Sequence, residues 1–133
     1  MTAYLDTSVL VRYFMRDVED LARIALRIVE QDQPLLVTPV VLAETAHVLL
    51  RNYGLPRAIV VESLRELVEN PNISVPGIDK GWLHEALALC QPSGRVSIPD
   101  ALTWAQARSS GTRRVYSFDA RFPSDGLEIR TKP

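Results

Sequence analysis

The sequence has few of the residues on which several protein classes depend. Its 133 residues include one cysteine, Cys90, which excludes an internal disulfide and a zinc site built from cysteine thiolates. Lysine occurs only at Lys80 and Lys132, and the formal net charge is −1, so the overall charge does not indicate a nucleic-acid partner. No apolar run approaches the roughly 18 residues that a membrane span needs. A secretory signal pattern is also missing, and we therefore expect a cytoplasmic protein without a membrane segment.

The residues that are abundant favour one globular domain. Apolar residues make up 47% of the chain, which is enough to fill one hydrophobic core. Short apolar runs alternate with segments whose apolar residues have helical spacing, and this alternation predicts an α/β domain with a parallel sheet over residues 1–133. Strands are predicted at 3–5, 35–37, 73–75, 115–118 and 127–130, and helices follow Asp6 and span about 20–31, 39–53, 57–69, 79–90 and 99–111. We expect the first strand to be buried.

Three carboxylates lie where a strand ends or a helix begins. Asp6 and Asp119 each follow a strand, and parallel strands share a carboxyl edge, so we expect these two residues to converge. Asp100 lies in the first turn of a helix. Each also has a structural explanation: Asp6 as a helix N-cap, Asp100 as a charge favoured by the helix dipole, and Asp119 as a turn residue.

Glu44 differs from the other acids because it lies in the middle of a helix, where capping cannot explain it. Its neighbours one turn away are Val40, Val41 and Val48, so the pattern predicts a carboxylate that faces the interior or the wall of a cleft. A buried carboxylate needs a cation. That cation is either a metal or a basic side chain, with His47 as the only local candidate and a core Glu–Arg pair as the alternative.

An oxygen-only set of ligands favours a hard cation such as Mg²⁺ or Mn²⁺. Carboxylates around such an ion suit metal-assisted hydrolysis of phosphodiesters, because the metal lowers the pKa of water and balances charge on the phosphate. Mutual repulsion within the set should raise the pKa of some of these acids. For contact with RNA phosphates we favour Arg121, which follows the Asp119 strand, with Arg12 and Arg16 as lesser candidates.

Four sequence pieces together resemble the PIN-domain proteins, and specifically the VapC-type toxins of prokaryotic toxin–antitoxin pairs. The pieces are Tyr4–Leu10, Leu42–Glu44, Pro99–Leu102 and Ser117–Phe122, in that order. The resemblance implies a three-layer α/β/α sandwich with a parallel sheet of strand order 3-2-1-4-5. It also implies a Mg²⁺- or Mn²⁺-dependent endoribonuclease that dimerises and binds a small VapB-like antitoxin.

The resemblance assigns roles to individual residues. The metal-binding acids would be Asp6, Glu44, Asp100 and Asp119. Ser117 would orient Asp119 or a water molecule, and Thr7 and Ser8 match the polar pair after the first acid. Two positions depart from the usual pattern: Ser97 stands where many relatives have another Asp, and Thr103-Trp104 replaces small aliphatic residues.

Other functions fit the sequence less well. A PIN-fold RNA- or protein-binding module without useful activity would have no need of four clustered carboxylates. A phosphoacceptor receiver domain needs an acidic pair after its first strand and a late Lys, and neither is present. A haloacid-dehalogenase-type phosphatase needs a second Asp two residues after the first, where this chain has Ser8.

Overall fold

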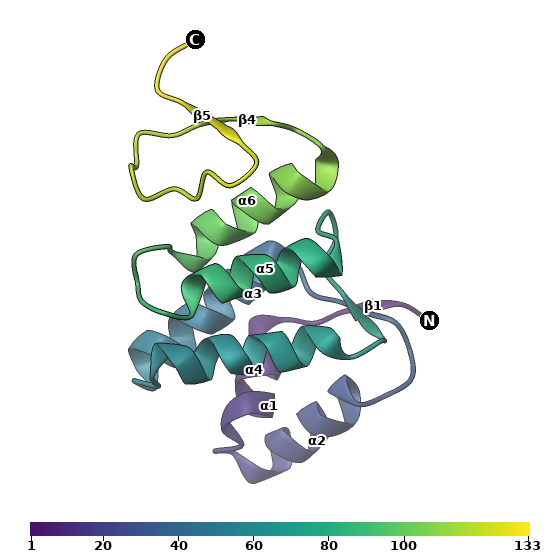
Figure 1. The fold of residues 1–133 in the computed structure, drawn as a ribbon. Coiled ribbons are helices and arrows are strands. Elements are labelled where there is room, and N and C mark those ends of the chain that lie inside the picture. The colour runs from purple at the N-terminus through teal and green to yellow at the C-terminus, as the bar shows by residue number, and fades with distance from the viewer. The chain divides into compact units, whose positions relative to one another are not determined.

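A computed structural model describes all residues from 1 to 133. The chain divides into two compact units, Met1–Pro76 and Gly77–Pro133, which are described separately (Figure 1). Unit 1 contains β1 (Ala3–Tyr4), α1 (Thr7–Met15), α2 (Glu19–Val29), β2 (Leu35–Leu36), α3 (Pro39–His47), the π-helical turn η1 (Val48–Asn52), α4 (Arg57–Glu69) and β3 (Ile73–Ser74). Unit 2 contains α5 (Lys80–Cys90), α6 (Ile98–Ser110), β4 (Arg114–Tyr116) and β5 (Glu128–Arg130).

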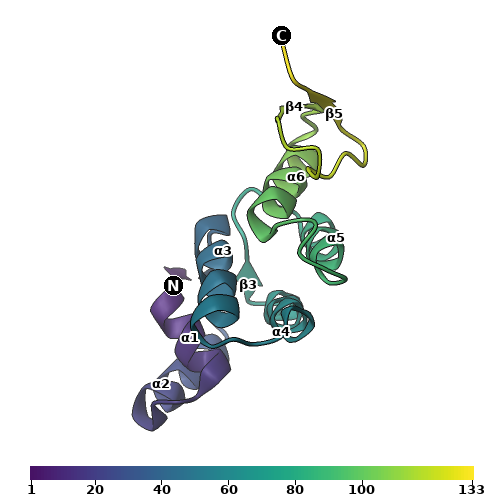
Figure 2. The same cartoon turned by 90° about the vertical axis from the view of Figure 1, so that its left-hand side faces the viewer.

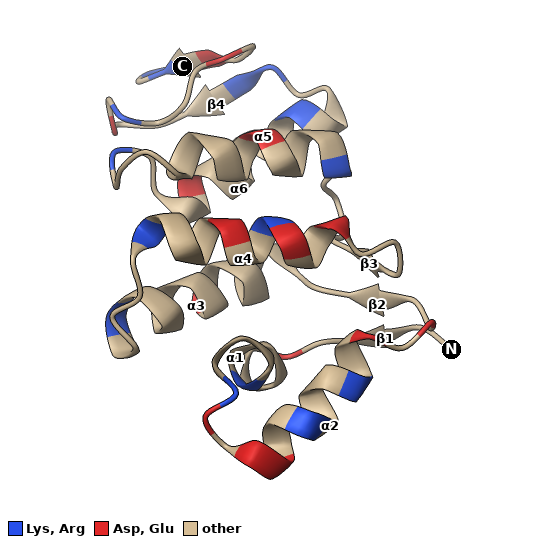
Figure 3. Cartoon of the chain, turned by 60° about the horizontal axis from the view of Figure 1, so that its bottom comes forward, with Lys and Arg blue, Asp and Glu red and all other residues tan.

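The strands of unit 1 form a parallel sheet in the order β1-β2-β3 (Figure 3). In its register Ala3 is opposite Leu35, and Leu35 is opposite Ile73. Leu35 and Ile73 are buried, as is Val37 just after β2. Because parallel strands are usually covered on both faces, such short strands consist almost entirely of apolar residues.

The helical segment of α3 and η1 begins and ends at signals that the sequence contains. Thr38 caps α3 by accepting a hydrogen bond from the backbone N–H of Val41 at 3.1 Å, and Pro39 occupies the first turn. The helical segment continues to Asn52 as η1, close to its predicted end at residue 53. Gly54 follows with φ +65°, the left-handed conformation that glycine adopts without strain. Helix α1 packs against α2 and α3, and α3 packs against α4.

Unit 2 is built on the pair α5 and α6, which lie side by side (Figure 2). Cys90 of α5 is fully buried and belongs to the core of this unit. Ser97 caps α6 and Gly111 ends it with φ +75°. Strands β4 and β5 pair in parallel, with Arg114 opposite Glu128.

The predicted α/β class is confirmed, because the chain contains six α-helices and every strand pair is parallel. The pairs within the units agree with the 3-2-1 and 4-5 parts of the expected order. Three further expectations stay predictions: that strands 1 and 4 are adjacent in the sheet, that the fold has three layers, and that residues 1–133 form a single domain. None of the helices combines the length and the apolar character that crossing a membrane requires.

The predicted burial of the first strand is wrong. Tyr4 is 66% exposed, and of the apolar run before Asp6 only Leu5 is buried. The reason is that β1 is an edge strand of its three-stranded sheet and pairs only with β2. The apolar run indicated a strand correctly but not how much of it neighbouring elements cover.

Candidate active site

A hollow of about 470 Å³ in unit 1 contains two of the four acids identified from the sequence. Its walls come from the start of α1 and from the helical segment that α3 and η1 form. The residues that line it are Asp6, Thr7, Ser8, Val11, Arg12, Glu44, Val48, Asn52 and Tyr53. Because α1 packs against α3, Asp6 and Glu44 line the same hollow although they are 38 residues apart in the sequence.

Asp6 is held by the first turn of α1. Its Oδ2 accepts hydrogen bonds from the Ser8 backbone N–H at 3.1 Å and from the Ser8 hydroxyl at 2.7 Å. The hydroxyl bond, followed by the backbone bond, lowers the pKa of Asp6 below its ordinary value of 3.8. Asp6 is therefore ionised at neutral pH, and its side chain stays exposed to solvent.

Glu44 lines the hollow but is not buried. Of the two predicted positions, the interior is excluded, because the Glu44 side chain is exposed and Val40, one turn earlier, is 75% exposed. Glu44 forms no ion pair with a basic residue, and His47 is exposed as well. The alternative of a core Glu–Arg pair is therefore excluded, and the cleft-wall position remains.

Two hydroxyls near these acids are buried without a partner. Thr7 lines the hollow and is 7% exposed, and Thr45, the residue after Glu44, is fully buried. The Oγ1 atoms of both residues make no hydrogen bond within the protein. Buried hydroxyls usually have a partner, and an unpaired one is often found at a functional site.

The arginines proposed for substrate contact lie in different places. Arg12 lines the hollow with Asp6 and Glu44. Arg16, four residues later, lines a separate hollow with residues of α4 and has φ 54°. Arg121 belongs to unit 2, where its Nε lies 3.2 Å from Asp119 Oδ1. Among the three, the structure brings only Arg12 to the hollow of unit 1.

Asp100 and Asp119 belong to unit 2. Asp100 lies in the first turn of α6, and its backbone N–H donates to the hydroxyl of Ser97 at 3.2 Å. Ser97, which stands where many relatives have another Asp, therefore acts here as the N-cap of the helix that carries Asp100.

Asp119 follows β4 in a turn held by its neighbours. Its backbone N–H donates to the Ser117 hydroxyl at 3.1 Å, and its Oδ1 accepts from the Arg121 backbone N–H at 2.8 Å. The backbone bond and then the side-chain bond from Arg121 lower the pKa of Asp119 below 3.8. The pKa values of Asp6 and Asp119 are thus both lowered, because local hydrogen bonds favour the charged form, and the expected rise for some of the four acids through mutual repulsion stays a prediction.

The loop after Asp119 is fixed to α6 by a cluster of aromatic and basic side chains. The carbonyl of Asp125 accepts from Trp104 Nε1 at 2.8 Å and from Arg108 Nη1 at 2.7 Å. The Arg108 guanidinium lies 4.1 Å from the ring centre of Trp82, a cation–π distance. Trp104 is 2% exposed, so this departure from the family pattern is part of the core of unit 2.

In unit 1 the carboxylates suit a hard divalent cation, although neither unit gathers three potential protein ligands around one point, and Asp119 of unit 2 is paired with Arg121. Asp6 and Glu44 fit such an ion because they are oxygen donors without a basic partner and lie open to one hollow. Asp100 and Asp119 are placed in unit 2, and their convergence with the first pair stays a prediction.

Sequence reasoning missed three residues next to this hollow. Tyr53 and Asn52 line it from the end of η1, and Asp17 bonds to both Arg12 and Tyr53. The available signal was that Tyr53 and Asn52 lie two turns beyond Glu44 on one helical segment. The polar character of these residues at the end of an otherwise apolar helix indicates a surface that faces solvent or a ligand.

Comparison with protein families identifies the fold family. The PIN domain profile matches residues 3–124, which includes all four acids. The chain therefore belongs to the PIN domain family, whose members are typically metal-dependent nucleases that act on RNA. A comparison with curated proteins gives no match.

Proposed function

We propose that this protein is a Mg²⁺- or Mn²⁺-dependent endoribonuclease and the toxin of a VapC-type toxin–antitoxin pair. The observation that carries the proposal is that Asp6 and Glu44, from separate helices, line one hollow in a chain matched to the PIN domain over residues 3–124. Asp6 is ionised, Glu44 has no basic partner, and the order of the four acids along the chain follows the PIN pattern.

In this proposal the metal is bound by Asp6, Glu44, Asp100 and Asp119. The bound ion would lower the pKa of a water molecule and balance charge on the scissile phosphate. Ser8 holds the Asp6 carboxylate in place through two hydrogen bonds, and Ser117 holds the turn that presents Asp119. Such fixed carboxylates do not need to reorganise when the ion binds.

The biological setting is part of the same proposal. We place the protein in the cytoplasm as a single PIN-like domain over residues 1–133, as a homodimer, and in complex with a VapB-like antitoxin that covers the acids. The substrate is RNA. Expression of the chain without its antitoxin should arrest growth, and an Asp6→Asn variant expressed at the same level should not.

The direct experiment is cleavage of a labelled single-stranded RNA by the purified protein. The proposal is supported if the protein cleaves the RNA with Mg²⁺ or Mn²⁺ and does not cleave it with EDTA. It should also leave a DNA of the same sequence intact. Asp100→Asn and Asp119→Asn should each lower the rate by roughly 10²-fold or more, as loss of one electrostatic or general-base group does. RNA that is bound but stays intact under all metal conditions would instead indicate a binding module.

A further inference from the structure

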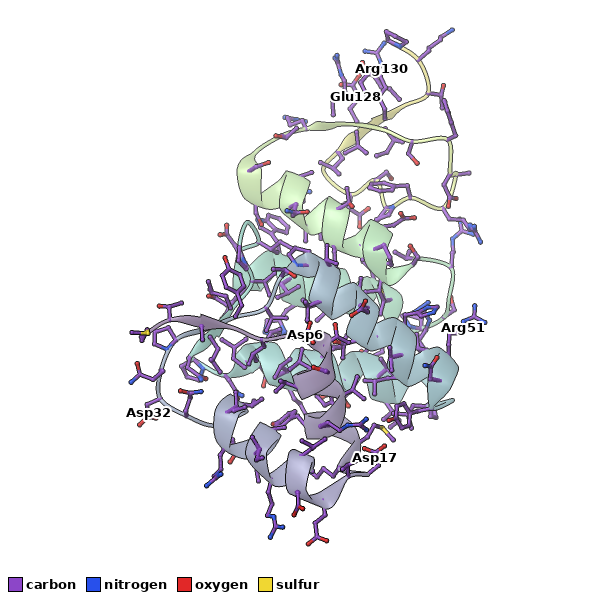
Figure 4. All side chains as sticks on the ribbon, turned by 180° about the vertical axis from the view of Figure 1, so that it is seen from behind. Asp6, Asp17, Asp32, Arg51, Glu128 and Arg130 are labelled. Atoms are coloured by element: carbon purple, nitrogen blue, oxygen red, sulfur yellow. The ribbon has the colours of Figure 1, made fainter.

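Arg12, Asp17 and Tyr53 form a closed set of hydrogen bonds at the edge of the Asp6–Glu44 hollow. Arg12 Nη1 lies 2.8 Å from Asp17 Oδ1 and 3.3 Å from the Tyr53 hydroxyl, and that hydroxyl donates to Asp17 Oδ2 at 2.8 Å. The three residues come from α1, from the loop after α1 and from the end of η1. Figure 4 shows Asp6 and Asp17 near opposite ends of α1, with Arg12 between them in the sequence.

The set leaves part of the Arg12 guanidinium without a partner. Both of its hydrogen bonds use Nη1, so the N–H groups of Nε and Nη2 bond to no other protein atom. These groups form the planar fork with which arginine binds two oxygens of a phosphate. The Arg12 side chain is 32% exposed and is one of the residues that line the hollow.

The partners of Arg12 hold this fork in one orientation. Both oxygens of Asp17 are engaged, one by Arg12 and one by Tyr53, and these two contacts lower the pKa of Asp17. A flexible arginine loses rotamer freedom when it binds a phosphate, and a guanidinium held in advance loses less. Arg16 has only the backbone carbonyl of Tyr13 as a partner, at 3.4 Å, and lines a different hollow.

We propose that Arg12 binds a backbone phosphate of the RNA next to the scissile one, through Nε and Nη2, and that Asp17 and Tyr53 position it for this contact. The proposal rests on the proposed function, because it takes the substrate of the Asp6–Glu44 hollow to be RNA. It adds a phosphate contact and two positioning residues to that site. The opposing explanation is that the three side chains only fix the end of α1 to the end of η1.

The experiment measures binding of a fluorescent single-stranded RNA in EDTA, so that binding is separated from cleavage. Affinity is recorded from low to moderate salt for the wild type, Arg12→Ala, Arg12→Lys and Arg27→Ala. Arg27 is the matched control because it is exposed on α2, away from the hollow, and its loss removes the same charge. Circular dichroism at the assay temperature gives the folded fraction of each variant.

Loss of a phosphate contact has a defined signature. Arg12→Ala should weaken RNA binding about tenfold and reduce the salt slope by about one, while Arg27→Ala leaves both near wild type. Arg12→Lys should keep the slope, because the charge remains, and recover only part of the affinity, because the fork is lost. Equal effects of Arg12→Ala and Arg27→Ala would overturn the proposal.

Tyr53→Phe tests the positioning role without changing the charge. It should raise the Kd of the folded protein several-fold with an unchanged salt slope, and raise KM with little change in kcat where cleavage is measured. A purely structural role would lower the folded fraction but leave the Kd of the folded protein as in the wild type. Wild-type protein that binds RNA with this Arg12 dependence but never cuts it would overturn the proposed function alone.

Discussion

The Asp6 carboxylate accepts both of its hydrogen bonds from Ser8 through a single oxygen, Oδ2. The bonds cap α1, and the other oxygen, Oδ1, takes part in neither. The two explanations that the sequence allowed for Asp6, a helix cap and a metal ligand, are therefore compatible. The cap fixes the carboxylate and keeps it ionised, which are the properties that a ligand of a divalent cation needs.

Substitution of Asp6 should separate its two roles. Asp6→Asn keeps an oxygen that can accept from the Ser8 backbone N–H, so the free energy of unfolding should stay near that of the wild type while RNA cleavage is lost. Asp6→Ala removes the cap and should cost about 1 kcal/mol as well. Urea unfolding of both variants checks this, and equal destabilisation by Asn and Ala would contradict a capping role.

Glu44→Gln should leave the metal-free protein as stable as the wild type, because Glu44 is exposed and has no ion pair to lose. A ligand that binds only the folded state raises the melting temperature. Mn²⁺ should therefore raise the Tm of the wild type and raise that of Glu44→Gln much less. Differential scanning calorimetry with and without Mn²⁺ measures this, and an equal shift in both proteins would remove Glu44 from the metal site.

Gly126 is required by the position of Arg108. Gly126 has φ +74°, and a Cβ there would overlap the Arg108 guanidinium, whereas Gly111 with φ +75° has open space. Gly111→Ala should cost about 1 kcal/mol of backbone strain. Gly126→Ala should cost about 1–2 kcal/mol more, since Arg108 must leave the Asp125 carbonyl and the Trp82 ring.

The extra cost of Gly126→Ala has its own control. In an Arg108→Ala background the overlap is absent, so Gly126→Ala should cost no more than Gly111→Ala. Urea unfolding of the single and double variants gives the coupling. Additive losses would show that Gly126 is required by its backbone alone.

The hydrogen bond between Tyr53 and Asp17 should make the melting temperature depend on pH in the acid range. The pKa of Asp17 in the folded chain lies below its ordinary value of 3.8, so its contribution is fully present above that pH and is lost as the pH falls through the lowered pKa. Tyr53→Phe removes the largest cause of this lowering. The variant should have a lower Tm than the wild type at pH 7, and the difference should narrow below pH 3.8. A constant difference from pH 7 to pH 3 would contradict this account.

Much of the fold could be predicted because its signals are local. The Thr38-Pro39 start of α3, the apolar face of α4 and the glycines after η1 and α6 each act within a few residues. The predicted and observed bounds of α4 coincide at Arg57–Glu69. The strands of unit 1 lie within their predicted ranges, and β4 and β5 overlap theirs, since each contains or adjoins an apolar run.

The errors arose where the outcome depends on residues distant in the sequence. Valines around Glu44 indicated either the interior or the wall of a cleft, and the spacing alone could not decide between them, because periodicity does not reveal which helix face a neighbour covers; Val40 is exposed. Tyr53 and Asp17 joined the site only through the fold, since they are 36 residues apart.

The central claim, that Glu44 is a metal-binding acid of an RNA-cleaving site, is tested most directly by single-turnover cleavage of RNA with saturating Mn²⁺. Glu44→Gln is compared with Glu62→Gln, an exposed glutamate of α4 that does not line the hollow. The account predicts that Glu44→Gln is folded and cleaves RNA roughly 10²-fold more slowly or worse, while Glu62→Gln matches the wild type. Cleavage by folded Glu44→Gln at the wild-type rate would contradict it.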